Sequence, residues 1–195
     1  MNIEIRKLTP ALAEDYVRFF DVTPHNQKHH VKCYCVCWCG DKPEGMDCST
    51  DEKRREAALQ YVKTGKLQGY LAYSDDQVVG WCNANTKTDC LQCISYRYLL
   101  GSVPIDMSAD MKTKSIFCFT VAPQMQRKGI ATRLLERVCQ EATKDGFDFV
   151  EAYPDKLFTA ESEDFMGYAE MYQKNGFIAV HETDDKYVMR KALKT

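Results

Sequence analysis

The fold is decided by Ser115-Ile116-Phe117-Cys118-Phe119-Thr120-Val121-Ala122-Pro123, followed two residues later by Gln126-Arg127-Lys128-Gly129-Ile130-Ala131-Thr132. The first seven residues are nearly all apolar, which predicts a central strand buried on both faces. Pro123 prevents a simple continuation of that strand. The chain then enters a helix, whose first amides lack partners within the helix and carry partial positive charge. A pyrophosphate placed there accepts several hydrogen bonds at once, so the stretch predicts a phosphate-binding turn.

The helix that follows this turn has one apolar stripe at helical spacing: Ile130, Leu134, Leu135, Val138, Cys139 and Ala142. Asp145-Gly146 ends it. Gly129 lets a ligand approach the backbone, and Arg127 and Lys128 add positive charge beside it. Taken alone, the Gln126 to Ala131 motif also fits an ordinary strand–turn–helix whose glycine only eases the turn.

Two further motifs make the turn more specific. Val121-Ala122-Pro123 precedes it, and Tyr172-Gln173-Lys174-Asn175-Gly176-Phe177 follows nearer the C-terminus. Together, over roughly Lys114 to Arg190, these motifs resemble the GNAT superfamily of N-acetyltransferases. The resemblance implies a single α/β (α+β) domain over residues 1–195, with a mixed, mostly antiparallel central sheet, flanking helices and a splayed central parallel strand pair. Residues 25–48 would form a Cys/His-rich insertion on the substrate side.

The resemblance also implies a reaction. Acetyl-CoA would be the co-substrate, and a primary amine of a small molecule or peptide would attack its thioester directly in a ternary complex. Tyr172 matches a tyrosine that can protonate the departing thiolate, although a core tyrosine packing on the sheet is the alternative. The residues implied to bind the cofactor are Phe119, Thr120 and Val121 along the pantetheine arm, and Gln126, Arg127, Lys128, Gly129, Ile130, Ala131 and Thr132 around the pyrophosphate.

The chain departs from the family pattern in two places. Phe165 stands where many members have an asparagine that contacts the cofactor, and the strand from Ser115 to Val121 carries no acid. Glu151, or else Asp155, could hold a water that deprotonates the amine, although strand-end acids are commonly solvated or paired. Bulk water could also take the proton. Cys118 raises the alternative of an acyl-cysteine route, but its apolar neighbours favour a structural thiol.

Ten cysteines are many for 195 residues. Cys33, Cys35, Cys37 and Cys39 alternate, so in an extended strand all four thiols would face one way. The candidate metal ligands are Cys90 and Cys93, which have metal-ligand spacing, together with His25, His29, His30 and Cys48. We interpret the thiols as small buried hydrophobes of the substrate-side wall, with no metal bound. The alternative function is a non-catalytic acyl-CoA-binding sensor whose cysteine cluster responds to redox state or metal.

Composition bounds the class of protein. Hydrophobic residues make up 45% and charged residues 28%, and the net charge of −2 is spread along the chain. A general nucleic-acid binder would need a basic face. The sequence has no long apolar run and no signal-peptide layout at its N-terminus, so we expect a cytoplasmic protein without membrane contact. A monomer or a homodimer fits equally.

The remaining elements are predicted from periodicity and turn residues. The order is strand, two helices, three strands, helix, strand, helix and two strands, with a parallel crossover around the helix that begins near Gln126. The predicted ranges are strand Ile3–Leu8, helix Thr9–Phe20, a helix from Ser49 to Gly65, a hairpin of Leu67–Ser74 and Gln77–Asn85, strand Phe147–Tyr153, helix Glu163–Lys174, and strands Phe177–His181 and Tyr187–Arg190.

Overall fold

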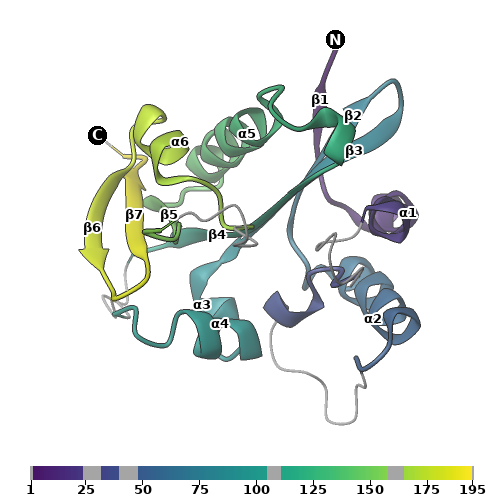
Figure 1. Cartoon of the computed structure of the whole chain (residues 1–195), viewed down its shortest axis with the longest axis horizontal. Helices are drawn as coiled ribbons and strands as arrows, with labels where there is room; N and C mark the ends of the chain where they lie inside the picture. Colours follow the sequence, from purple (N-terminus) through teal and green to yellow (C-terminus); the bar gives the residue numbers. More distant parts are fainter. Residues whose placement is uncertain (1, 24–31, 40–47, 105–110, 158–164, 195) are drawn as a thin grey trace.

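A computed structural model describes residues 2–23, 32–39, 48–104, 111–157 and 165–194 of the chain. Within these residues one mixed sheet has the strand order β1-β2-β3-β4-β5-β7-β6 (Figure 1). Only β4 and β5 pair in parallel; every other neighbouring pair is antiparallel. The strands are β1 (Glu4–Lys7), β2 (Gly69–Ser74), β3 (Gln77–Thr86), β4 (Thr113–Val121), β5 (Phe149–Ala152), β6 (Ile178–Glu182) and β7 (Tyr187–Ala192). The predicted fold class is confirmed.

Helices cover both faces of this sheet. The helical elements are η1 (Pro10–Leu12), α1 (Ala13–Val22), η2 (Val36–Trp38), α2 (Asp51–Lys63), α3 (Lys87–Cys90), α4 (Ile94–Leu99), η3 (Pro123–Met125), α5 (Ile130–Lys144) and α6 (Ala169–Lys174). In Figure 1, α5 and α6 lie on one side of the sheet, and α1, α2, α3 and α4 lie on the other. None of the described helices is long and apolar enough to cross a membrane.

Each face has its own hydrophobic core. On the α5 side, Leu134, Leu135 and Val138 pack with Ile116 of β4. On the other side, helices α1 and α2 pack with η2 and with Phe117 of β4. Because β4 contributes buried side chains to both cores, it is the central strand that its apolar run predicts.

A bulge and a splay shape the end of β4. Opposite Asn83 and Ala84 of β3, the register of β4 shifts by one residue, so that Phe117 and Cys118 both enter the same core. Pairing with β5 covers only Thr113–Ile116. Beyond Ile116 the two parallel strands separate, and the edge of β4 that faces β5 is open to other partners. This is the splayed pair that the family resemblance implies.

The cysteine-rich segment is not extended, so the arrangement of an extended strand, with all four thiols on one face, does not apply to it. Tyr34 and Cys35 have left-handed backbone angles (φ 48° and 51°), and a 3-10 turn follows at Val36–Trp38. The turn buries the aromatic rings of Tyr34 and Trp38 against different partners. Tyr34 packs against Phe20, and Trp38 stacks on Phe117 with ring centroids 4.6 Å apart. Burial of these rings therefore dominates over the alternating pattern.

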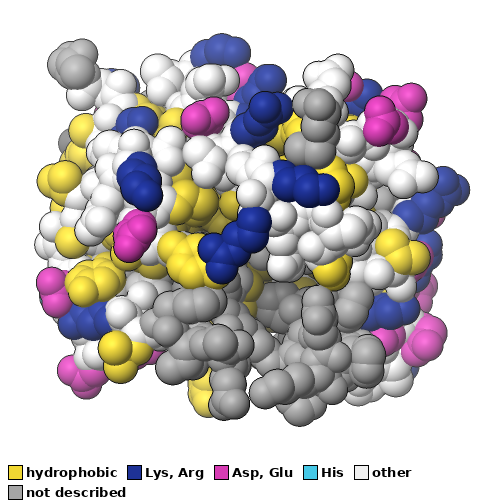
Figure 2. All heavy atoms as spheres, turned by 45° about the horizontal axis from the view of Figure 1, so that its top comes forward, with side chains coloured by type: hydrophobic (Ala, Val, Ile, Leu, Met, Phe, Trp, Pro, Cys, Tyr) yellow, Lys and Arg dark blue, Asp and Glu magenta, His cyan; other side chains and the backbone are white. Residues whose placement is uncertain are grey.

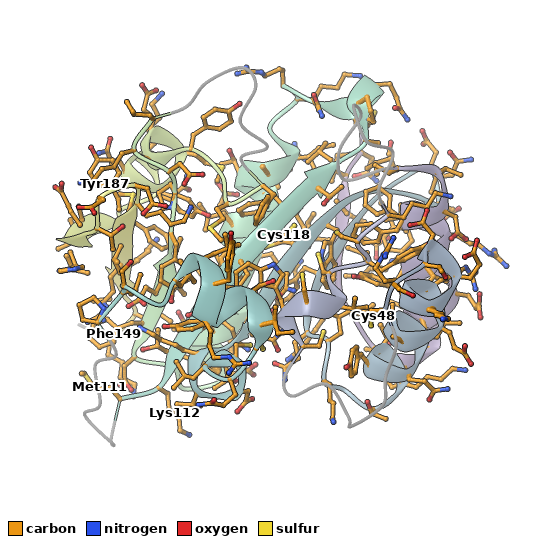
Figure 3. The ribbon with its side chains drawn as sticks, turned by 60° about the horizontal axis from the view of Figure 1, so that its bottom comes forward. Cys48, Met111, Lys112, Cys118, Phe149 and Tyr187 are labelled. Atoms are coloured by element: carbon orange, nitrogen blue, oxygen red, sulfur yellow. The ribbon has the colours of Figure 1, made fainter. Side chains whose placement is uncertain are left out.

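The thiols themselves lie on several elements. Figure 3 shows Cys48 near α2 and Cys118 on β4, in the middle of the molecule. In the part of the chain that the structure describes, no three His, Cys, Asp or Glu residues are placed to hold a metal ion. The possible ligands His25, His29 and His30 lie outside the described residues.

The last helix is shorter than predicted. It begins at Ala169 instead of near Glu163, and residues 158–164 lie outside the described part. Gly167 has φ +83° and Tyr168 is extended, so helical geometry is not possible before Ala169. Between β3 and β4 lie two short helices, α3 and α4.

Candidate active site

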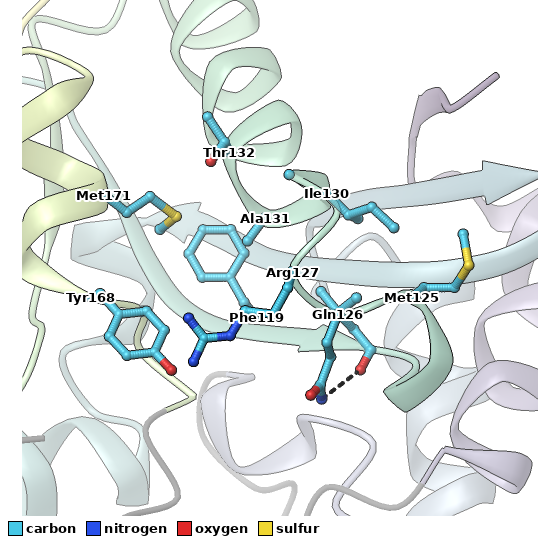
Figure 4. A pocket seen from close by; sticks show the side chains of 12 residues that line it. Phe119, Met125, Gln126, Arg127, Ile130, Ala131, Thr132, Tyr168 and Met171 are labelled. Carbon is cyan, nitrogen blue, oxygen red and sulfur yellow. Dashed lines mark hydrogen bonds between the residues drawn. The ribbon is translucent and has the colours of Figure 1, made fainter. Parts of the chain in front are cut away.

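The predicted phosphate-binding turn has the geometry of an open helix start. Gly129 occupies the N-cap of α5 with φ 77°, and no side chain caps the helix. The first amides of α5 therefore remain available to a ligand. Arg127 also has a left-handed conformation (φ 61°). Gln126 fixes the turn to the strand, because its Nε2 donates to the carbonyl oxygen of Val121 at 3.3 Å (Figure 4).

A pocket of about 380 Å³ opens between this turn, the end of β4 and the start of α6 (Figure 4). Eight of the ten residues predicted to bind the cofactor line it: Phe119, Val121, Gln126, Arg127, Gly129, Ile130, Ala131 and Thr132. Thr120 does not, because its side chain lies beside the buried Cys118 thiol at 3.7 Å. Lys128 does not either; its Nζ lies 3.8 Å from the sulfur of Met125.

Four lining residues are missing from the sequence prediction: Met125, Gly167, Tyr168 and Met171. Tyr168 and Met171 come from the start of α6 and form the wall opposite β4. In Figure 4 the guanidinium of Arg127 extends toward Tyr168, and its carbon lies 5.7 Å from the ring centroid. Tyr168 precedes α6 in an extended conformation, and no motif in the sequence marks Tyr168 or Met125.

A second hollow, of about 530 Å³, continues from the pocket along α6. The two share Arg127, Thr132, Tyr168 and Met171. The charged residues of the second hollow are Arg127, Lys156, Lys174, Asp155 and Glu170. Figure 2 shows Lys and Arg side chains interspersed with hydrophobic ones over the face that Figure 1 has at its top. The mixture of basic and hydrophobic side chains on this face suits a ligand with both apolar and anionic parts.

Tyr172 lies next to the pocket but does not line it. The side chain is completely buried, and its hydroxyl donates to the carbonyl oxygen of Met166 at 2.6 Å. Its ring packs against Phe177 (5.2 Å between centroids) and Phe119 (6.5 Å). In this conformation the hydroxyl faces the backbone of residues 166–167 rather than the pocket.

Glu151 is the centre of a buried ion-pair network. One carboxylate oxygen accepts from Lys87 Nζ at 2.6 Å and from the Tyr153 hydroxyl at 2.7 Å. The other accepts from Arg190 Nε at 2.9 Å and Nη2 at 2.7 Å. Glu151 has no exposed surface. Both carboxylate oxygens are engaged by four donors from three side chains, so these contacts favour a structural role.

Two residues near Glu151 complete the polar network. The hydroxyls of Tyr153 and Ser115 are 2.9 Å apart. Burial, and then the charge of Glu151, raise the pKa of Tyr153 well above its usual value. Asp155, the other acid that the sequence singles out, pairs with Lys186 and lines the second hollow. Neither acid is therefore placed as an unoccupied base.

The sheet, its splayed strands and the open helix start define an acyltransferase of the GNAT type. The model of the Acetyltransferase (GNAT) family matches residues 41–177. The chain belongs to this family, and acetyl transfer is its general activity. A search of the curated proteins finds no match.

Solved structures with the same fold are distant in sequence. A PaiA N-acetyltransferase from Thermoplasma acidophilum, in complex with coenzyme A, is 14% identical with a TM-score of 0.56, over 98% of this chain and 99% of the other. A polyamine N-acetyltransferase from Drosophila melanogaster, which forms N-acetylagmatine, is 14% identical with a TM-score of 0.53 over both full chains. A chain of the NatC complex bound to Gag peptide and CoA is 13% identical with a TM-score of 0.58, also over both full chains.

Proposed function

We propose that the protein transfers an acetyl group from acetyl-CoA to a primary amine of a small molecule or peptide. The observation that carries this proposal is the pocket between β4, the uncapped start of α5 and α6. It offers backbone amides for a pyrophosphate, and for a pantetheine arm it offers a strand edge that β5 does not cover. Coenzyme A in the PaiA N-acetyltransferase structure supports the choice of donor.

The reaction then follows from the groups around the pocket. The nitrogen lone pair of a free amine attacks the thioester carbonyl carbon, and backbone amides of β4 polarise the carbonyl oxygen. The C–S bond breaks as the tetrahedral intermediate collapses. Tyr172 gives a proton to the leaving thiolate and recovers one from solvent. The amide product and coenzyme A leave the site.

The base that deprotonates the amine is a separate question. Glu151 is the acid predicted from the sequence, and that assignment stays a prediction. To act, its carboxylate would have to exchange contacts with Lys87 or Arg190 for contact with a water. We propose that bulk water takes the proton and that Glu151 holds β5 and β7 together.

The fold does not determine which amine is the acceptor. One related structure is of an enzyme that forms N-acetylagmatine and another is of a complex bound to a Gag peptide and CoA, so the fold does not choose between a small molecule and a peptide. Release of thiol from acetyl-CoA over a panel of polyamines, amino acids and N-terminal peptides tests the proposal. Cytoplasmic location and a monomeric or homodimeric state remain predictions of the sequence.

Tyr172→Phe tests the role of the phenol. Turnover should fall about 100-fold, in the range that general acid catalysis contributes, with much less change in cofactor affinity. Steady-state kinetics together with calorimetric titration of coenzyme A measure both. Equal loss of turnover and cofactor affinity would contradict the proton-donor role.

One observation favours a non-catalytic acyl-CoA sensor as the second candidate: no acid on β4 or β5 is placed as an unoccupied base. Cofactor binding without thiol release over the whole panel would establish it. The cysteines give the sensor little support, because burial raises the pKa of Cys37 to about 11 and that of Cys39 well above its usual value. Thiols of this kind react slowly with oxidants.

A further inference from the structure

Two consecutive backbone carbonyls accept hydrogen bonds from two groups that the proposed acetyl transfer uses as donors. The carbonyl oxygen of Phe165 accepts from the amide of Phe119 at 2.6 Å. The carbonyl oxygen of Met166 accepts from the hydroxyl of Tyr172, also at 2.6 Å. The Phe119 amide lies on the splayed edge of β4, where the pantetheine arm would pair, and Tyr172 is the proposed proton donor.

The backbone that carries these carbonyls lies between the two donors. A Cβ added at Gly167 would lie 3.2 Å from the Tyr172 hydroxyl and 3.4 Å from Cδ2 of Phe119. The short stretch of residues 165–167, called the blocking segment here, therefore fills the space between β4 and α6. It also contributes Gly167 to the pocket wall.

An extended ligand pairing with β4 would need the same amide. The Phe119 amide has one hydrogen, so it cannot donate a full hydrogen bond to the Phe165 carbonyl and to a pantetheine carbonyl at the same time. In the same way, the Tyr172 hydroxyl has one proton and currently directs it at Met166. The state described by the structure therefore binds the blocking segment in place of a ligand.

We propose that the blocking segment is an internal competitor of the cofactor, displaced from Phe119 and Tyr172 when acetyl-CoA binds. This inference rests on the proposed function and adds a regulatory step to it. Gly167 is suited to the movement, because its backbone (φ +83°) lies in a region that glycine enters and leaves at little cost. Displacement exposes the proton donor only when the cofactor is bound, which couples cofactor binding to formation of the active site.

The proposal predicts an unusual response to Tyr172→Phe. Removing the hydroxyl breaks one of the bonds that hold the blocking segment, so the open state becomes more populated. Apparent affinity rises with that population. Coenzyme A should bind the variant about threefold to tenfold more tightly than the wild type, the effect expected from one neutral hydrogen bond. Turnover falls in the same variant.

Tyr16→Phe is the matched control. Tyr16 is equally buried, and its hydroxyl donates to a backbone carbonyl, that of Tyr34, at 2.7 Å. It lies on α1, in the core on the other face of the sheet. Its removal should leave coenzyme A affinity unchanged. Calorimetric titration of both variants and the wild type with coenzyme A gives the comparison.

A crystal structure of the wild type with coenzyme A provides the second measurement. We expect the Phe119 amide to bond the pantetheine arm, with the Phe165 oxygen beyond hydrogen-bonding distance. Two results would overturn the proposal that the blocking segment competes with the cofactor: retention of both bonds in that complex, or unchanged or weaker coenzyme A binding by Tyr172→Phe. Either result would leave the proposed function standing. A wild type that binds no coenzyme A would overturn the proposed function itself.

Discussion

β4 and β5 meet in two ways along their length. In the paired half, Thr113–Ile116 faces Phe149–Ala152, and the acid of that half, Glu151, is enclosed by Lys87, Arg190 and Tyr153. In the splayed half, Phe117–Val121 has no partner in the β4–β5 ladder, and the Phe119 amide donates to the carbonyl oxygen of Phe165. The difference shows which polar groups a ligand can reach. Groups in the paired half stabilise the fold, and groups in the splayed half are available for exchange.

Removing the charge of Glu151 should have the largest effect. Glu151→Gln leaves two cations facing a neutral amide in a buried site, so stability should fall by about 3–5 kcal/mol. Glu141→Gln is the matched control, because Glu141 also pairs with an arginine and a lysine but on the surface of α5. Its cost should stay at about 0–1 kcal/mol. Urea unfolding measures both, and similar losses for the two variants would contradict a structural role for Glu151.

A second buried charge in the paired half, Lys114, has weak partners. Its Nζ contacts Gln68 Oε1 at 3.3 Å and lies 4.5 Å from the Phe147 ring centroid. Burial lowers the pKa of Lys114 to about 8. Because this pKa is lower in the folded chain, the unfolded chain binds more protons between about pH 8 and the ordinary lysine pKa of 10.5, and stability rises with pH over that window.

Replacing this lysine should therefore stabilise the protein. At pH 7, Lys114→Met is expected to raise the free energy of unfolding by about 1–3 kcal/mol and to remove the rise above pH 8. The exposed Lys63→Met provides the control and should change neither quantity. Urea unfolding at a series of pH values decides the matter; a destabilised Lys114→Met protein would show that its contacts outweigh the cost of burial.

The smallest effect is expected at the turn itself. Gly129→Val places a branched side chain at φ 77°, where a Cβ meets nothing within 4 Å because it points into open space. The variant should lose about 1–2 kcal/mol of stability and bind coenzyme A at least about tenfold more weakly, since the side chain would stand where the ligand approaches.

Gly65→Val is the control that separates the loss of stability from the loss of coenzyme A affinity. Gly65 has φ +71° and equally open surroundings, but it follows α2 on the opposite side of the sheet. It should show the same loss of stability with no loss of coenzyme A affinity. Equal affinities for the two variants would show that Gly129 does not face the cofactor.

Much of the fold was predictable because it depends on local patterns. The apolar run of β4, the hairpin turn at Asp75 and Asp76, and the stripe of α5 each identify their element from neighbouring residues alone. The Cys33–Cys39 segment was not predictable, because its shape depends on where Phe20 and Phe117 lie to receive two aromatic rings. Alternation gives a strand only when nothing distant competes for the side chains.

The site was predictable to a smaller extent. The turn has a motif of its own, so its residues could be named from the sequence. Besides Tyr153, which follows β5, the partners of Glu151 come from α3 and β7, 64 and 39 residues away, and no spacing in the sequence connects these two with Glu151. The contacts of Phe165 and Met166 are made by backbone carbonyls, which every residue type carries, so composition holds no signal of them.

The strand order has a consequence for how the chain assembles. Strands β1 to β4 come from residues 4–121 and strands β5 to β7 from residues 149–192, so each half of the sheet is contiguous in sequence. Only four residue pairs of the β4–β5 ladder join the halves in the sheet. The pocket takes Phe119 from the first half and Met171 from the second. A ligand there would contact both halves of the sheet and, because it binds only the folded chain, would stabilise their association.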